Sequence, residues 1–126
     1  TLCSGQLVNL SLTSSIVGTS FQWLATSNAN VQGENSSPQT SSFINDSLVN
    51  TTSIAQIVNY TINPSYNGCN GPPQTVQVTV NPSPVINSSA TVTICSGNAV
   101  GLNLSSSIPG TSFTWQAAAT NTVTGE

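Results

Sequence analysis

The sequence predicts an all-β protein built of modules in tandem, and three observations support this prediction. Apolar residues alternate with polar ones over short stretches, and residues such as Gly, Pro and Asn separate these stretches. No helical periodicity runs along the chain. The motif Gly18-Thr19-Ser20-Phe21-Gln22-Trp23 returns at residues 110–115 with an offset of 92. The 126 residues are therefore one period of about 92 residues plus the start of the next.

The offset of 92 holds without a gap over the 34 positions that the two copies share. It aligns a Cys-Ser-Gly triplet, two pairs of leucines, an isoleucine and a Gly-Glu pair, namely residues 3–5 with 95–97, Leu10 and Leu12 with Leu102 and Leu104, Ile16 with Ile108, and residues 33–34 with 125–126. We therefore expect positions 92 apart to have the same structural role in consecutive modules.

The composition narrows the possible functions. The chain has no Lys, Arg or His and only three acidic residues, which give a net charge of −3. Because phosphate binding needs cationic side chains, we expect no nucleic-acid binding and no adsorption to anionic lipid. The apolar runs are too short for membrane insertion. Ser, Thr and Asn make up 53 of the 126 residues, which fits a disordered linker or a secreted β protein, and the alternation favours the second.

Four stretches of the first period alternate clearly enough to predict strands, at residues 7–12, 20–26, 54–63 and 75–80. Residues 42–50 fit a strand or a short helix, because Ile44 and Leu48 suit either spacing, and we favour the strand. Residues 63–73 are dense in turn formers and predict a hairpin loop. Short strands joined by Gly/Pro turns indicate an immunoglobulin-like β-sandwich.

The predicted domain organisation is one module, a joint and part of a second module. Residues 1–81 form the first module, which lacks a counterpart to the opening strand predicted for the second. Residues 82–84, Pro-Ser-Pro, form a semi-stiff linker. Residues 85–126 form the N-terminal part of the next module and begin with a strand over 85–94.

The aromatic residues of both copies are predicted to be core residues. They lie in the middle of strands and in phase with apolar neighbours, as core side chains do; they are Phe21, Trp23, Tyr60, Phe113 and Trp115. The alternative for the two tryptophans is a platform on which sugar rings stack. Burial would favour the core role, and exposure would favour the platform.

The order of motifs along the chain resembles a known family. Cys-Ser-Gly is followed by Val-x-Leu-x-Leu, Gly-Thr-Ser-Phe-x-Trp-x-Ala, Val-x-Gly-Glu, Asn-Thr-Thr, Val-x-Tyr-x-Ile-x-Pro, Gly-Cys-x-Gly and Val-x-Val-x-Val-Asn-Pro. This string is similar to the PKD-like, immunoglobulin-like tandem repeat of large surface proteins in Bacteroidota. The resemblance implies export through the type IX pathway, an extracellular location at the cell surface, and a role in an adhesin stalk or filament.

Three cysteines occur, and Cys95 is the counterpart of Cys3, so its own partner would fall beyond residue 126. In an exported protein we expect a disulfide between Cys3 and Cys69. A metal site on these cysteines is disfavoured, because no His and few acids are present to complete four ligands.

Two further positions are weak candidates for sites. Glu34 and Glu126 occupy the same place in the repeat, so one carboxylate could help to bind calcium at a module junction. Tight calcium sites gather several acids, however, and a hydrogen bond at a strand end is the favoured role. No other metal or cofactor is expected, and Asp46 has no evident partner for acid–base catalysis.

Ser47 is a candidate for O-glycosylation. Asp46-Ser47-Leu48 matches the Asp-Ser/Thr-aliphatic acceptor pattern that the resemblance to Bacteroidota proteins brings with it. Several Asn-x-Ser/Thr sequons also occur, but a chain so rich in these residues produces them by coincidence. A glycan would supply the surface hydration that charge supplies in other proteins.

The predicted function is that of a non-catalytic structural repeat in a secreted, multi-module surface filament or adhesin stalk. No His, Lys or Cys–His pair is present to activate a nucleophile, so we do not expect an enzyme. The predicted partners are neighbouring repeats, or copies of the same chain in a filament. The alternatives are a carbohydrate-binding module of a secreted protein and a small subunit that polymerises by strand complementation.

Overall fold

The computed structural model describes residues 1–125 and divides the chain into two compact units, Thr1–Ser83 and Pro84–Glu126. The boundary falls inside the Pro-Ser-Pro stretch predicted as a joint. Every strand of the described residues lies in the first unit, and these residues contain no helix, so the all-β prediction is confirmed. No described helix could therefore cross a membrane.

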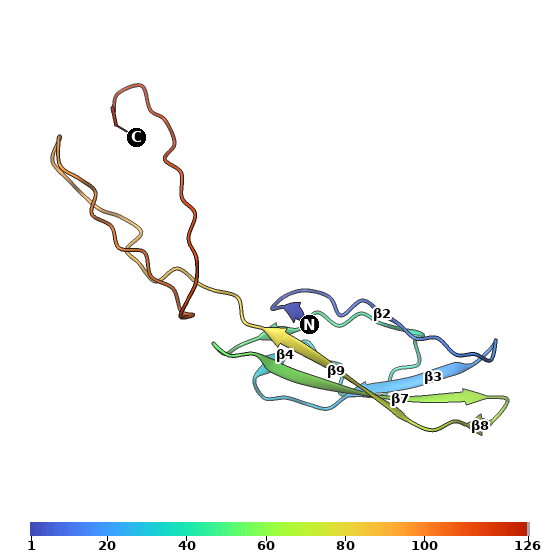
Figure 1. Cartoon of the computed structure of the whole chain (residues 1–126). Coiled ribbons are helices and arrows are strands. Elements are labelled where there is room, and N and C mark those ends of the chain that lie inside the picture. Colours follow the sequence, from blue (N-terminus) through green and yellow to red (C-terminus); the bar gives the residue numbers. More distant parts are fainter. Residues whose placement is uncertain (126) are drawn as a thin grey trace. The chain divides into compact units, whose positions relative to one another are not determined.

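The largest sheet of the first unit has the order β1-β9-β7-β3, with β8 paired to the end of β7 (Figure 1). Its strands are β1 (Leu2–Cys3), β3 (Ser20–Ala25), β7 (Gln56–Tyr66), β8 (Cys69–Asn70) and β9 (Gln74–Asn81). The pairs β3–β7 and β7–β9 are antiparallel, whereas β1 runs parallel to β9. The long central strand β7 therefore determines where the other strands lie.

Two short antiparallel pairs complete the unit, β2 with β5 and β4 with β6. Their bounds are β2 (Leu10–Ser11), β4 (Val31–Gln32), β5 (Phe43–Ile44) and β6 (Val49–Asn50). Isolated bridges join Leu7 to Ser47, which both lie in loops, and Trp23 of β3 to the loop residue Gln39. Side chains from the short pairs and from the large sheet share one apolar core, as expected for a two-layered β fold.

The core is made by the alternating residues of the strands. In β7 the buried residues are Val58, Tyr60 and Ile62, each two positions from the next, because successive side chains of a strand point to opposite faces. The other buried hydrophobic residues are Trp23, Ala25, Val31, Ile44, Leu48, Val78 and Val80. The predicted inward positions of residues 75–80 agree with this core, although Val76 is only half-buried.

The predicted hairpin loop is tighter than expected. Strand β7 continues to Tyr66, and the chain reverses at Asn67-Gly68, where φ is +48° and +80°. Positive φ at both central residues is the requirement of a type I′ turn, which Asn-Gly satisfies better than other pairs. The turn is therefore encoded by two residues rather than by the whole loop.

Two other stretches depart from their predicted bounds. Residues 42–50 are extended rather than helical, with alternate residues buried, but only their ends form β5 and β6. The strand predicted at residues 7–12 is reduced to β2, and Ile54 lies before β7 with 67% of its surface exposed. Backbone pairing with a distant segment, and not alternation alone, determines how long each strand is.

The second unit has no strand among its described residues, 84–125, so the strand predicted at residues 85–94 is wrong. It has one isolated bridge, from Ile86 to Ser106. The reason lies in the partners. With an offset of 92, the positions equivalent to β7 and β9 are not among the given residues, so the described part of the second unit offers residues 85–94 no strand of this kind to pair with.

Candidate functional site

One buried polar group of the first unit is the carboxylate of Asp46, which is 4% exposed. It accepts hydrogen bonds from the backbone N–H of Asn35, at 2.9 Å, from the Asn35 side-chain amide, and from the hydroxyl of Tyr60, at 2.9 Å. A buried carboxylate is stable only when its oxygens are hydrogen-bonded. Because Tyr60 belongs to the large sheet, this cluster joins the loop around Asp46 to that sheet.

Tyr60 donates to Asp46 from the centre of the core. Burial raises the pKa of the Tyr60 phenol far above its ordinary value, and the hydrogen bond to the Asp46 carboxylate raises it further. The phenol is therefore a proton donor that stays protonated in alkaline solution. Such a group serves structure, since acid–base catalysis needs a pKa near the working pH.

The sequence did not reveal the role of Asp46, although one signal was present. Asp46 stands in phase with the buried residues Ile44 and Leu48, so the alternation places its side chain inside the molecule. Asn50 continues the phase and is also buried, and its amide donates to the backbone oxygens of Ile54 and Val80. A polar residue at a position where the alternation places buried side chains therefore indicates a buried polar group that needs hydrogen-bond partners.

Glu34 lies two residues after the end of β4. Its Oε1 accepts the backbone N–H of Asn28, which braces the loop after β3. Its other carboxylate oxygen is buried without a hydrogen-bond partner. The described residues hold no group of three or more Asp, Glu, Cys or His side chains that could bind a metal. The second calcium candidate, Glu126, lies outside the described residues.

Gly33 explains why the Gly-Glu pair begins with glycine. Its φ is +90°, and a Cβ atom at this position would lie 2.0 Å from the backbone oxygen of Ser47. Only glycine fits this approach. The glycosylation candidate Ser47 is exposed, and its hydroxyl donates to the backbone oxygen of Gly5 at 3.3 Å.

The aromatic residues of the first unit are core residues, as predicted. Trp23 is 3% exposed, and its ring meets that of Tyr60 edge-on with the ring centroids 5.8 Å apart. Its indole N–H donates to the backbone oxygen of Ser41 at 2.9 Å. Phe21 is half-buried against the same core.

The core prediction is wrong for Trp115, which is 82% exposed, whereas Phe113 is half-buried. Trp23 is covered by Tyr60. The counterpart of Tyr60 would be position 152, which is not among the given residues, so no equivalent ring covers Trp115. Trp115 instead borders a hollow of about 500 Å³ with Val100, Leu102 and Leu104. The two tryptophans therefore have equivalent positions but unlike surroundings.

The disulfide predicted between Cys3 and Cys69 is absent, and both thiols are free and exposed. The register of the sheet gives the reason. Cys3 lies beside Asn81, next to the start of β7, and Cys69 lies beside Tyr66 at its end. Ten strand residues at about 3.3 Å each separate these ends by about 30 Å. A disulfide needs Cα atoms no more than about 7 Å apart.

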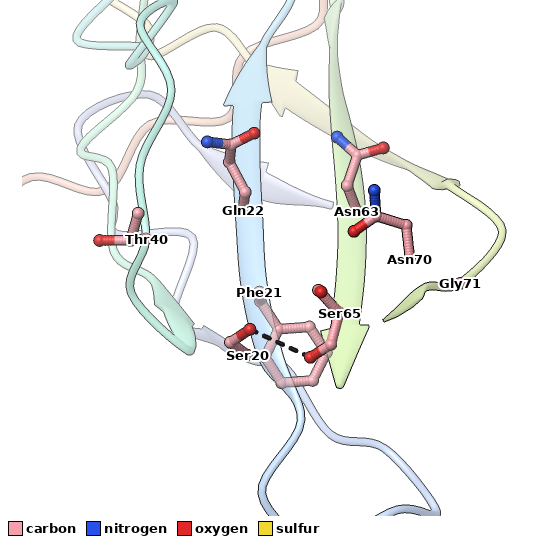
Figure 2. A pocket seen from close by; sticks show the side chains of 8 residues that line it. All are labelled: Ser20, Phe21, Gln22, Thr40, Asn63, Ser65, Asn70 and Gly71. Carbon is pink, nitrogen blue, oxygen red and sulfur yellow. Dashed lines mark hydrogen bonds between the residues drawn. The ribbon is translucent and has the colours of Figure 1, made fainter. Parts of the chain in front are cut away.

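A hollow of about 450 Å³ lies at the start of β3 (Figure 2). Its lining carries hydroxyl, amide and phenyl groups but no titratable side chain, and it consists of Ser20, Phe21, Gln22, Thr40, Asn63, Ser65, Asn70 and Gly71. The Ser20 hydroxyl donates to the backbone oxygen of Ser65 across the strand pair, at 3.0 Å. This hollow can offer hydrogen bonds, but its lining has no titratable side chain to activate one of its hydroxyl groups.

Local structure repeats with the sequence. The hydroxyl of Thr19 donates to the backbone oxygen of Ile16 at 2.7 Å, and the counterpart bond from Thr111 to Ile108 has the same length. The turn after each Cys-Ser-Gly triplet closes with a backbone hydrogen bond of 3.1 Å to Cys3 or Cys95. Gly33 and its counterpart Gly125 have φ values of +90° and +89°. Equivalent turns therefore fold alike in both units, although only the first has a complete core.

Comparison with protein families gives one match. The chain matches the PKD-like domain family over residues 1–84 and 92–126, so the match covers both units. No curated protein and no solved structure shows a significant match. PKD-like domains are generally non-catalytic and typically extracellular. The all-β fold, the two repeated units and this match lead to one conclusion: the chain belongs to the PKD-like domain family.

Proposed function

We propose that this chain is a structural repeat of a secreted, multi-module filament or adhesin stalk on a bacterial surface, of the kind found in Bacteroidota. The observation that carries the proposal is the recurrence of the same turns and hydrogen bonds at positions 92 apart. Repetition of a rigid unit lengthens a protein without adding chemistry. The chemistry of the first unit is consistent with this role, because its buried Asp46 and Tyr60 serve the core.

The near absence of charge also supports an assembled, extracellular role. Only three acidic residues and no basic ones occur in 126 positions, so little electrostatic repulsion keeps copies apart. The surface is hydrated by hydroxyl and amide groups instead. We propose that Ser47, which is exposed, carries an O-linked glycan that adds to this hydration.

Single-molecule stretching tests the proposed function. A tandem array made of residues 1–92 should unfold in equal steps of about 30 nm, because each module releases its folded residues 1–83 at roughly 3.6 Å each. An array of the same length with Trp23→Ala in every module should lose the steps, because its core is broken. A wild-type array that extends without steps would contradict a mechanical role.

The exposed indole of Trp115 favours a second candidate, a carbohydrate-binding module. A flat, exposed aromatic ring is a typical platform for a sugar ring, and a mostly apolar hollow lies beside it. The buried state of Trp23 opposes this role for the repeat. Titration with soluble oligosaccharides, followed by tryptophan fluorescence, separates the two: sugar-dependent quenching that Trp115→Ala removes would favour carbohydrate binding.

A further inference from the structure

The hollow at the start of β3 lies on the outer face of the large sheet. Ser20 and Gln22 of β3 alternate with side chains that point to the core, and so do Asn63 and Ser65 of β7. These four side chains therefore point away from the core and into the hollow. We call the polar residues of the lining the polar array: Ser20, Gln22, Thr40, Asn63, Ser65 and Asn70.

One row of the polar array crosses three segments of the chain. Gln22 of β3 lies opposite Asn63 of β7. On the other side of β3, Gln39 bridges Trp23 in the antiparallel orientation, so the next residue, Thr40, lies beside Gln22. Figure 2 shows the amide groups of Gln22 and Asn63 next to each other. Opposite side chains on neighbouring strands have Cβ atoms about 5 Å apart, so one small molecule can contact the whole row.

A second row lies two residues further along the strands. Ser20 lies opposite Ser65, and Ser65 lies opposite Asn70 of β8. Two residues of a strand span about 7 Å, so the rows are about this far apart. The polar array therefore brings hydrogen-bonding groups from four segments of the chain around one hollow of about 450 Å³. This volume falls within the range of about 300–1,000 Å³ that is usual for small-molecule sites.

Most of the polar array makes no hydrogen bond within the chain. Among the described residues, its one side-chain hydrogen bond runs from the Ser20 hydroxyl to the backbone oxygen of Ser65. The amide groups of Gln22, Asn63 and Asn70 therefore present both donors and acceptors to the hollow. Asn63 is only half-buried, so the partner of its amide comes from what fills the hollow.

The fold does not require the amide of Gln22. Phe21 and Trp23, its neighbours on the inward face, return unchanged as Phe113 and Trp115, but the counterpart of Gln22 is Thr114. The repeat thus keeps the inward residues of this strand and changes the outward one. A long amide side chain at position 22 is therefore available for binding.

The chemistry of the polar array selects the class of ligand. No charged side chain lines the hollow, so an anion would meet no cationic group and a metal ion would meet no carboxylate. An extended peptide binds by backbone hydrogen bonds along a strand edge, whereas this hollow crosses the face of several strands. Hydroxyl groups of a sugar both donate and accept, and so do the amides and hydroxyls of the polar array.

We propose that the polar array binds a neutral carbohydrate through the side-chain amides of Gln22, Asn63 and Asn70. The site goes beyond the proposed structural role, because it lets the side of a filament repeat hold a polysaccharide. It lies in the first unit and uses no indole ring. An open polar site without charge or a stacked ring binds weakly, so we expect a Kd on the order of 1 mM.

Nuclear magnetic resonance of the ¹⁵N-labelled full chain tests the proposal, with cellotriose, maltotriose and mannotriose as probes. The side-chain NH₂ signals of Gln22, Asn63 and Asn70 should shift together with one Kd, while the indole N–H signal of Trp115 should not move. Because the ligand is neutral, the Kd should be the same at about 0.01 M and 1 M salt. Trigalacturonic acid should bind more weakly than these sugars, since the chain has a net charge of −3 and no cation.

Two variants remove amides on different strands. Gln22→Ala in β3 and Asn70→Ala in β8 should each raise the Kd about tenfold, because each removes hydrogen bonds to the sugar. Gln77→Ala is the matched control: it makes the same truncation on the same face of the sheet, outside the hollow, and should change the Kd by less than about twofold. All three positions are exposed, so the fold should be retained.

Each contrary result overturns the proposal in its own way. The absence of shifts in these amide signals with all three sugars excludes the site, while the stretching experiment still judges the filament role. Shifts confined to the Trp115 indole assign sugar binding to that ring. Equal weakening by Gln22→Ala and Gln77→Ala excludes the polar array as the binding surface. An uncharged peptide of Ser, Thr and Asn that shifts the same signals at lower concentration excludes a carbohydrate as the ligand.

Discussion

Trp23 is a core residue because other strands of the first unit cover its side chain. Its indole is enclosed by the core and hydrogen-bonded to Ser41, whereas the equivalent Trp115 is exposed. The side chain, the neighbouring Phe and the turn before them are the same in both units. The difference comes from β7, which only the first unit contains.

Trp23→Ala should destabilise the first unit by about 3–5 kcal/mol, because it removes a large buried ring and leaves a cavity. Trp115→Ala is the matched control and should change the free energy of unfolding by less than about 0.5 kcal/mol, as exposed positions do. Chemical denaturation followed by circular dichroism measures both. Equal effects of the two changes would contradict the difference in burial.

The Asp46–Tyr60 pair makes a prediction about alkaline pH. The pKa of Tyr60 is raised in the folded state, so the folded protein keeps a proton that the unfolded chain loses above its ordinary pKa of 10.0. Its contribution to stability is complete below pH 10.0. Above that pH, stability should fall by about 1.4 kcal/mol per pH unit as the unfolded chain ionises.

The control for this pH dependence is Tyr60→Phe. It should lower stability at neutral pH by about 1–3 kcal/mol, because a buried oxygen of Asp46 loses its donor. It should also flatten the decline above pH 10.0, because no buried phenol remains to titrate. Denaturation curves across this pH range measure the slope, and an unchanged slope in the variant would assign the decline to another group.

At the scale of the elements, β7 determines the geometry of the first unit. It pairs with β3, β8 and β9, and its inward residues form the centre of the core. Because β7 is long, the segments attached to its two ends are held far apart. The free state of the cysteines follows from this length.

The separation of Cys3 and Cys69 predicts that the first unit gains nothing from oxidation. Both thiols should react with a thiol reagent in the folded state, because both are exposed. The midpoint of unfolding of the monomeric chain should be the same with and without reductant. A disulfide linking these two residues within one chain, found by mass spectrometry without reduction, would contradict the register of the sheet.

At the scale of the whole molecule, the two units are unequal. All buried hydrophobic residues of the core belong to the first unit, and the described part of the second has one isolated bridge and no strand. The large apolar side chains of the second unit are exposed at several positions, among them Val92 and Trp115. Structural stability therefore resides in residues 1–83.

A chain shortened to residues 1–83 should fold alone and unfold at the same temperature as the full chain, because no core residue is removed. Differential scanning calorimetry on both chains at low concentration measures the two midpoints. A shortened chain that lacks a cooperative transition would show that the second unit contributes to the core of the first.

The sequence by itself determined the all-β class, the period of 92 and the family to which the chain belongs. It also determined the inward residues of β7 and the buried Trp23. The fold class and the inward residues depend on alternation between neighbouring residues, and the period depends on the repetition of motifs. Both patterns can be read from the sequence without knowing the tertiary structure. The Asn-Gly turn is of the same kind, since two adjacent residues encode it.

Only the tertiary structure decided the separation of the cysteines, the burial of Asp46, the exposure of Trp115 and the absence of a strand at residues 85–94. Each depends on which distant segments lie side by side. Alternation in the sequence indicates which face of a strand is apolar. The backbone N–H and C=O groups of that strand also need a neighbouring strand to bond with, and the order and register of the whole sheet determine which strand that is.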